Sequence, residues 1–227
     1  MTGVQTCALP ILLRKAYPNP KRTIVAGHWS SEEQGLNGSR AWAEDHPEVV
    51  RGLQALFNQD NGTGRVVSLS ASGLMGAGGN LARWLSKVPN DIGGRVQLSV
   101  PGSPAGGGSD NASFVCYGAP AFSLGASDWG YSPYTWHTNR DTFDKIVFED
   151  LLANATLTAM LVYLASEDPE TLSRERRVFD VGDSPAAAAL GRGGRGGRGG
   201  GAGRGGAGGG SWPTCTAPLR SAANYNR

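Results

Sequence analysis

The sequence predicts an α/β fold with three layers, in which helices cover both faces of a mixed, largely parallel sheet. Three observations support this prediction. Strand-like runs alternate with helical patterns along the chain, which is typical of an α/β layer fold. Arg22–Trp29 is an apolar run (Arg-Thr-Ile-Val-Ala-Gly-His-Trp) typical of a central strand covered on both faces. Val147–Ser166 has the pattern of an amphipathic helix about five turns long.

The remaining elements are expected between these two segments. In an α/β sheet, ligands bind in the crevice beyond the carboxyl ends of the strands, so the loops that follow strands are the first place to look for a site. We expect strands at 53–58, 65–69, 95–100 and 121–125, helices at 34–45, 81–87 and 111–117, a glycine-rich loop at 101–110 and a polar, aromatic loop at 127–144.

Composition divides the chain into three parts. Residues 1–11 (MTGVQTCALPI) show neither a helical nor a strand period and lack the basic start and apolar run of a signal peptide, so we interpret them as a foreign leader. Residues 185–227 are rich in Gly, Arg and Ala, bury little apolar surface and are expected to be a disordered tail. Residues 12–184 remain as one body with a substantial core.

The charge differs between the body and the tail. The first 184 residues hold 15 Lys or Arg and 19 Asp or Glu, whereas the tail holds six Arg and no acidic residue. The body therefore lacks the basic bias of a nucleic-acid-binding domain and suits metal cations. The Arg-Gly-Gly run at 192–200 resembles RNA-binding tails but contains no aromatic residue, so we expect no nucleic-acid partner. No apolar stretch approaches the length of a membrane span, and none is expected.

Cysteine usage is sparse. Cys7 lies in the leader, Cys215 in the tail, and Cys116 alone in the body. The sequence therefore predicts neither a disulfide framework nor a thiolate metal site, and cysteine usage does not indicate the cellular compartment.

Glu32 and Glu33 follow the expected strand Arg22–Trp29 directly, where both carboxylates can border one cleft. Two adjacent carboxylates repel each other, which raises a pKa, and a nearby cation removes that repulsion. One carboxylate can then bind the metal while the other acts as a base. Taken alone, the same pair is more typical of negative charge at the N-terminus of a helix.

Asp60 and His137 extend this set. Asp60 precedes Asn61-Gly62, a hairpin-turn signal, and His137 lies in the polar loop, so each alone is more typical of a structural residue. Together with the glutamate pair they provide the carboxylate oxygen and imidazole nitrogen that zinc accepts. A two-metal hydrolase activates water between ions about 3.5–4 Å apart, and a carboxylate base passes the proton to the leaving amine.

Several spaced motifs resemble metallopeptidase family 28, which includes bacterial leucyl aminopeptidases and relatives of glutamate carboxypeptidase. The resemblance covers about Leu13–Pro169 and implies a zinc-exopeptidase fold of the phosphorylase/hydrolase type, two zinc ions and a peptide substrate. The motifs, in the order of the family, are Arg22-Thr-Ile followed by Trp29-Ser-Ser-Glu-Glu-Gln-Gly-Leu-Asn-Gly-Ser39, then Asn58-Gln-Asp60, Gly102-Ser-Pro with Ser109-Asp110, and Trp136-His-Thr-Asn-Arg-Asp-Thr142.

The resemblance implies a role for each matched residue. Glu32 resembles the general base, and Glu33 and His137 resemble two ligands of one zinc ion. Asp60 resembles a ligand of the other zinc ion, and Asp110 a residue of the substrate pocket or of the support behind the ligands. Pocket or supporting positions are also implied for Trp136, which stands where some relatives have an oxyanion-stabilising Tyr, for Tyr131 or Tyr134 as substitutes, and for Asp141, which orients the His137 loop or caps the turn before the last helix.

One part of the family pattern is absent. The family has an upstream His-x-Asp segment and a bridging Asp, and no His-x-Asp occurs in this chain. Those residues would precede Leu12, so we interpret the chain as an N-terminally truncated fragment with an incomplete sheet, inactive on its own.

The expected function is that of a zinc-dependent exopeptidase, of aminopeptidase type, with Glu32 as general base. The alternatives are a carboxypeptidase-type relative and an inactive fragment or binding module. Members of the family are often secreted or periplasmic, which the resemblance implies here as well, and the oligomeric state stays open.

Overall fold

The computed structural model describes residues 2–60, 62, 64–104, 108–178, 212, 213 and 215. The strands form one mixed sheet in the order β1-β4-β2-β3, which confirms the α/β fold. The pairs β1–β4 and β2–β3 are parallel, and the central pair β2–β4 is antiparallel. The strands are β1 (Leu56–Gln59), β2 (Val66–Ser70), β3 (Gln97–Ser99) and β4 (Ala121–Ala126).

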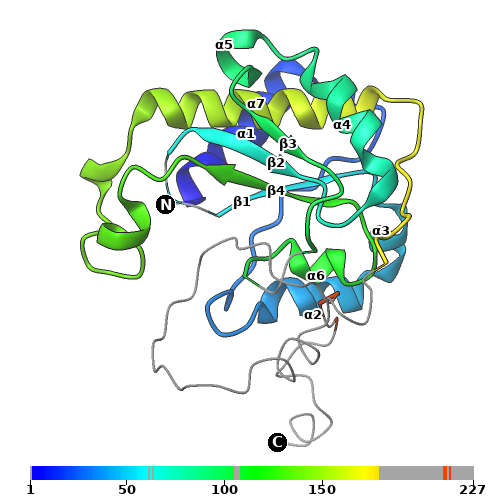
Figure 1. Ribbon diagram of the computed structural model, residues 1–227, viewed down its shortest axis with the longest axis horizontal. Coiled ribbons are helices and arrows are strands. Elements are labelled where there is room, and N and C mark those ends of the chain that lie inside the picture. The colour runs from blue at the N-terminus through cyan, green and yellow to red at the C-terminus, as the bar shows by residue number, and fades with distance from the viewer. Residues whose placement is uncertain are drawn as a thin grey trace, which may run out of the picture.

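Helices lie on both faces of this sheet (Figure 1). One face packs against α4 (Gly78–Leu85) and α7 (Phe148–Glu167). The opposite face packs against α2 (Asn37–Asp45), α3 (Pro47–Gly52) and α6 (Ala112–Val115). The other helical elements are α1 (Thr2–Ala16), α5 (Asn90–Gly93), the 3-10 turns η1 (Met75–Ala77) and η3 (Phe143–Lys145), and the single π-helical turn η2 (Tyr131–Thr135).

The two faces bury cores of different size. The larger core lies between the sheet and α4 and α7, where Leu69, Phe122 and Leu161 are fully buried. The smaller core gathers Phe114 of α6 with Val50 of α3 and residues around them. Full burial of a Leu or Phe side chain contributes roughly 1.5–3 kcal/mol, so the larger core is the main source of stability.

The prediction of a central strand at Arg22–Trp29 is wrong, because no residue of this segment belongs to a strand. Its start is held by the Arg22 side chain, which donates to the Asp168 carbonyl oxygen at 2.8 Å. Its end is held by Trp29, whose ring packs 5.5 Å from that of Phe114. Between these anchors no described strand pairs with the segment, and Val25 is 59% exposed. An apolar pattern forms a strand only where neighbouring strands provide hydrogen-bond partners.

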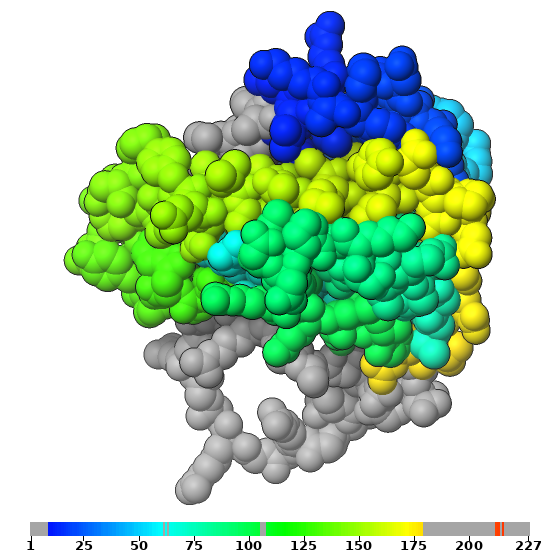
Figure 2. Space-filling view, turned by 90° about the horizontal axis from the view of Figure 1, so that it is seen from above, coloured from blue at the N-terminus to red at the C-terminus, as the bar shows by residue number. Residues whose placement is uncertain are grey.

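Two helix boundaries also differ from expectation. The helix predicted from residue 34 begins at Asn37, because Gly35 and Leu36 adopt left-handed conformations with φ of 103° and 61°. At the N-terminus α1 crosses the boundary expected at residue 11, so one helix joins part of the expected leader to the body. Figure 2 shows this helix lying along α7, and the ring of Tyr17, just after α1, packs against Tyr163 at 4.9 Å.

Helix α7 differs from expectation in another respect. Among the described residues it is long and apolar enough to cross a membrane by length and composition, so the statement that no such stretch exists is wrong. This is weak evidence for a span, because a core helix passes the same test, and Leu157, Leu161 and Leu164 of α7 lie in the larger core.

The tail contains a contact that the sequence did not predict. Cys215 forms a disulfide with Cys116, with 5.2 Å between their Cα atoms. Trp212 packs against both cores. Apart from Trp212, Pro213 and Cys215, the expected disordered tail lies outside the described residues.

Candidate active site

The glutamate pair lies in a tight turn before α2. The backbone N–H groups of Gly35 and Leu36 both donate to the Glu32 carbonyl oxygen, at 2.9 and 2.8 Å. Ser31 precedes the pair with a left-handed φ of 59°. This conformation brings Glu32 and Glu33 to the border of one cavity rather than to opposite faces of a strand.

Asp60 and Asp110 come from separate loops that a side-chain hydrogen bond joins. Asp60 follows the last residue of β1, and Asp110 precedes α6. Asn58 Nδ2, on β1, donates to Ser109 Oγ at 2.7 Å and joins the strand that leads to Asp60 to the loop that holds Asp110. Both carboxylates border the same cavity as the glutamate pair.

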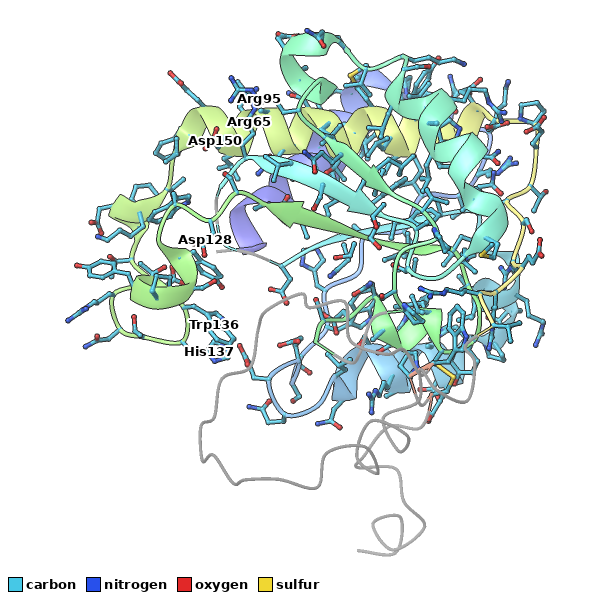
Figure 3. All side chains as sticks on the ribbon, viewed as in Figure 1. Arg65, Arg95, Asp128, Trp136, His137 and Asp150 are labelled. Atoms are coloured by element: carbon cyan, nitrogen blue, oxygen red, sulfur yellow. A yellow bond between two sulfur atoms is a disulfide. The ribbon has the colours of Figure 1, made fainter. Side chains whose placement is uncertain are left out.

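His137 reaches the glutamate turn from the long loop between β4 and α7. Its Nε2 lies 3.0 Å from Glu33 Oε1. The residue has a left-handed φ of 55°, and the Trp136 ring packs 4.2 Å from the imidazole. In Figure 3 Trp136 and His137 lie together at the end of this loop. Tyr134 lies 50% exposed under Arg140 instead, with the guanidinium carbon 4.9 Å from the ring centroid.

Tyr131 and Asp141 belong to the surroundings of this site. Burial raises the pKa of Tyr131 to about 12, and the negative charges of Asp60 and Asp141 add to this effect. The Tyr131 ring lies against Gly62, where a Cβ atom would come within 2.7 Å of it. A phenol with such a pKa stays protonated at neutral pH and keeps an O–H group that can donate a hydrogen bond.

Glu32 is the carboxylate whose protonation the site perturbs most clearly. Partial burial raises its pKa to about 7, and the negative charges of Asp60, Glu33 and Asp110 act in the same direction, while His137 opposes them. Burial also raises the pKa of Asp110, with Asp60 adding to the shift. A carboxylate with a pKa near 7 can accept and return a proton at neutral pH, as a general base must.

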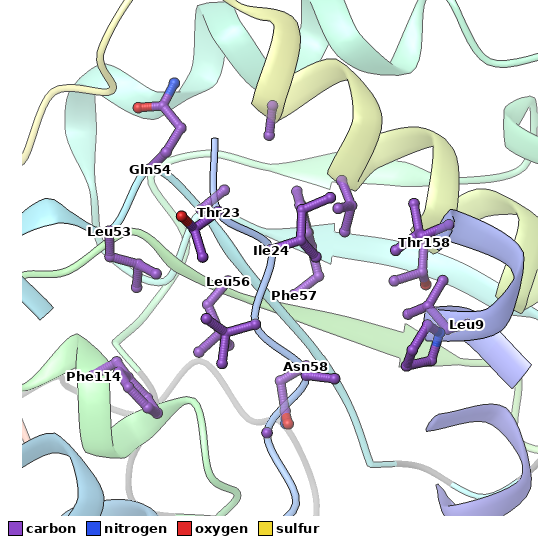
Figure 4. Close-up of a pocket in the computed structure, with 18 of the residues that line it drawn as sticks. Leu9, Thr23, Ile24, Leu53, Gln54, Leu56, Phe57, Asn58, Phe114 and Thr158 are labelled. Carbon is purple, nitrogen blue, oxygen red and sulfur yellow. The ribbon is translucent and has the colours of Figure 1, made fainter. Parts of the chain in front are cut away.

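The cavity beside these carboxylates has a volume of about 1350 Å³. It extends from the acidic side chains to α1 and α7, and Figure 4 shows Thr23 and Ile24 crossing it in front of Leu56 and Phe57. The site therefore lies at the β1 edge of the sheet, where the lining is acidic at one end and apolar at the other. The apolar lining includes Leu9, Leu13, Ile24, Leu56, Phe57, Leu124 and Val162.

The donor atoms fit a zinc ion in kind but not in number. Glu33 and His137 bring a carboxylate oxygen and an imidazole nitrogen together, which is a pair that zinc accepts. Within the described part of the chain, however, no three His, Cys, Asp or Glu side chains gather closely enough to hold a metal. Protein zinc sites use three or four protein ligands, so the described residues supply part of a site.

The sequence is similar to that of known peptidases. The model of "Peptidase family M28" matches residues 7–162, which is more than half of the chain. The chain belongs to peptidase family M28. The matched range begins within the segment that we interpreted as a foreign leader, although the origin of that segment stays an interpretation.

Curated and solved relatives agree with this family. The M28 chain is 30% identical over 151 residues to leucine aminopeptidase 1 of Coccidioides posadasii (strain C735), covering 64% of this chain and 39% of the relative. It is 32% identical over 146 residues to a probable glutamate carboxypeptidase of Arthroderma benhamiae, and the match covers 58% of this chain and 20% of the relative. A crystal structure of a peptidase M28 precursor from Shewanella amazonensis SB2B matches with a TM-score of 0.53 and 25% identity. This match covers 64% of this chain and 31% of the solved chain.

The chain thus spans about two fifths of the leucine aminopeptidase that it matches, or less in the other two cases. The comparisons support a peptidase hydrolase. The role of each site residue remains a prediction from the sequence.

Proposed function

We propose that this M28 chain carries part of the active site of a zinc-dependent exopeptidase of aminopeptidase type. The observation that supports this proposal best is the contact between Glu33 and His137, which come from distant loops and meet at 3.0 Å beside Glu32. A carboxylate and an imidazole in contact, next to a second carboxylate with a pKa of about 7, suit metal-assisted hydrolysis.

In this proposal Glu33 and His137 hold one zinc ion, and Asp60 belongs to the second. Bound zinc would lower the pKa of a water molecule and polarise the peptide carbonyl. Because fewer than three ligands meet among the described residues, the remaining ligands would come from outside them. Trp136, packed on the His137 ring, limits the orientations open to that ring.

The chain's own residues would move the proton. Glu32 would take a proton from the attacking water and deliver it to the leaving amine, because its carboxyl group ionises close to neutral pH. Tyr131, which stays protonated, would donate a hydrogen bond to the developing oxyanion.

Zinc titration of the intact chain by calorimetry tests the ligand assignment. We expect Glu33→Gln and His137→Ala each to weaken zinc binding at least about tenfold, since each removes one of few ligands. His28→Ala is the matched control, because this histidine is exposed on the extended segment and has no assigned role. Equal affinities in all three variants would exclude Glu33 and His137 as ligands.

Hydrolysis assays test the reaction class. We expect a peptide with a free N-terminus to release its first amino acid in the presence of zinc, and Glu32→Gln to lower that rate roughly 10²–10⁴-fold. Full activity after Glu32→Gln would exclude Glu32 as the base. Cleavage of an N-acetylated peptide would favour the carboxypeptidase alternative, which the similarity to a probable glutamate carboxypeptidase supports.

A second candidate is that this chain is an inactive fragment or a binding module. The lack of three converging ligands among the described residues favours it. It is supported if the intact chain binds zinc weakly and releases no amino acid from either peptide.

A further inference from the structure

The described residues of the C-terminal tail are Trp212, Pro213 and Cys215, which we name the C-terminal anchor. Trp212 and Cys215 contact residues of the body that are distant from them in the sequence. Cys215 is bonded to Cys116, 99 residues earlier, at the end of α6. The Trp212 indole Nε1 donates to the Arg177 carbonyl oxygen at 3.2 Å. The anchor therefore has one covalent and at least one non-covalent attachment to the body.

The Trp212 ring occupies a formed site between the two cores. It packs against both of them. Gly73, with φ of 87°, leaves room for the ring, since a Cβ atom there would lie 3.0 Å from both Trp212 and Pro104. The guanidinium carbon of Arg176 lies 4.9 Å from the centroid of the Trp212 ring. A guanidinium over the face of an aromatic ring attracts that ring, so Arg176 and the packing of both cores hold Trp212 in this site.

The wall of this site is held in place by backbone pairing. Arg176 forms an antiparallel bridge with Leu74. The Arg177 N–H donates to the Gly73 carbonyl oxygen at 2.8 Å. The Arg176 side chain also donates to the Cys116 carbonyl oxygen at 3.2 Å. Arg176 thus contacts both the Trp212 ring and the backbone of the disulfide-bonded cysteine, and it connects the two attachments.

We propose that the body contains a binding site for its own C-terminal segment, with Trp212 as the anchoring side chain and Cys116–Cys215 as a redox-sensitive lock. The lock closes by exchange with a disulfide oxidant such as oxidised glutathione. One thiolate attacks the oxidant's S–S bond and releases one glutathione, and the other thiolate then attacks the mixed disulfide and releases the second. Two protein S–H bonds are lost, one S–S bond forms, and the oxidant gains two electrons and two protons.

The lock bears on the site described above through α6. Cys116 ends α6, and Asp110 lies just before it, beside Glu32 and Asp60. An oxidised lock restrains this helix at its C-terminal end, whereas reduction leaves it held by non-covalent packing alone. This inference does not depend on the peptidase proposal, because it concerns the anchor and not the reaction.

The first test is the state of the thiols in the intact chain carrying Cys7→Ser, which leaves only the two cysteines of the lock. After refolding with oxidised glutathione we expect no reactive thiol on denaturation, two after reduction, and a Cys116–Cys215 linked peptide by mass spectrometry. Free thiols after oxidation, or disulfide-linked dimers in place of the internal link, would overturn the proposal.

The second test separates Trp212 binding from the covalent bond. In the oxidised chain, Trp212→Ala should increase the rate at which dithiothreitol reduces Cys116–Cys215 by roughly tenfold or more, because the anchored state loses the partly buried ring that packs against both cores. Trp212→Phe, which keeps a ring but loses the Nε1 donor, should restore most of the protection. The matched control is Trp129→Ala, since Trp129 is 38% exposed on another loop. Equal reduction rates in Trp212→Ala and Trp129→Ala would contradict an anchoring role.

Hydrogen exchange tests the effect on α6. We expect Cys215→Ser to increase amide exchange across Ala112–Gly118 several-fold, with little change in the middle of α7. Unchanged exchange across Ala112–Gly118 would show that the lock does not restrain this helix.

Discussion

The two edges of the sheet differ in how completely they are packed. At the β2–β3 side, α4 and α7 cover the strands, and side chains such as Leu69 and Trp84 are almost fully buried. At the β1 edge, the extended segment Arg22–Trp29 leaves a cavity of about 1350 Å³, and Val25 is largely exposed. The four carboxylates of the candidate active site, Glu32, Glu33, Asp60 and Asp110, border this cavity.

This difference separates the part of the molecule that buries most of the core from the part that holds the candidate site residues. The packed side resists change because each apolar group has close neighbours. The open side gathers carboxylates that repel each other, and the pKa of Glu32 is raised first by partial burial and then by that repulsion. Substitutions on the two sides should therefore change the free energy of unfolding by very different amounts.

The largest expected effect is a cavity in the packed side. Phe122 lies on β4, is fully buried, and packs 5.8 Å from the Phe57 ring. Phe122→Ala should lower the free energy of unfolding by about 3–5 kcal/mol in urea denaturation. The exposed Val25, replaced by Ala, should change it by no more than about 0.5 kcal/mol. Similar losses for the two variants would remove the distinction between the edges.

An intermediate effect is expected for Asp168, which is buried after α7. Its carboxylate accepts hydrogen bonds from Arg83 at 2.6 Å and from the Trp84 indole N–H at 2.7 Å. Asp168→Ala leaves these donors without their acceptor and should cost about 1–3 kcal/mol in urea denaturation at pH 7. The exposed Glu175, replaced by Ala, is the control. A loss no larger than that of the control would show that these hydrogen bonds do not stabilise the fold.

The same carboxylate predicts a pH dependence. Burial alone would raise the pKa of Asp168, but hydrogen bonds from Arg83, Trp84 and the Glu170 backbone outweigh it and lower the pKa to about 2. Because the folded pKa is below the unfolded value of about 3.9, this stabilisation is present above pH 4 and is lost as pH falls through about 2. In urea denaturation between pH 5 and pH 2, the free energy of unfolding should fall less steeply with pH in Asp168→Asn than in the unchanged chain.

The smallest expected effect lies at the open edge. The raised pKa of Glu32 favours its protonated form in the folded state. Its contribution to the free energy of unfolding is therefore fully present below the unfolded pKa of about 4.3 and is lost as pH rises through about 7. In metal-free chain, Glu32→Gln should raise the melting temperature slightly at pH 8 and not at pH 4. Solvent screening keeps this gain below about 1 kcal/mol. A lower melting temperature at pH 8 would contradict the raised pKa of Glu32.

Much of the sheet could be predicted from local pattern. The runs that became β2, β4 and α7 were located within one or two residues, because each forms from short-range periodicity and packs against a neighbour that is present. Arg22–Trp29 has an equally apolar pattern but forms no strand, since hydrogen-bond partners come from other segments and not from the pattern itself. The later start of α2 could not be predicted from the sequence. Leucine usually favours a helix, and nothing local indicates that Leu36 adopts a left-handed conformation.

By itself, the sequence determined the family and the residue types of the site, since Glu32, Glu33, Asp60 and His137 occur in an ordered set of motifs whose chemistry suits zinc. Only the tertiary structure decided which of them meet. It brings Glu33 to His137, raises the pKa of Glu32 through partial burial and three neighbouring carboxylates, and joins Cys116 to Cys215. Distances and electrostatic repulsion between residues far apart in sequence depend on how loops cross in space, and no local pattern contains that information.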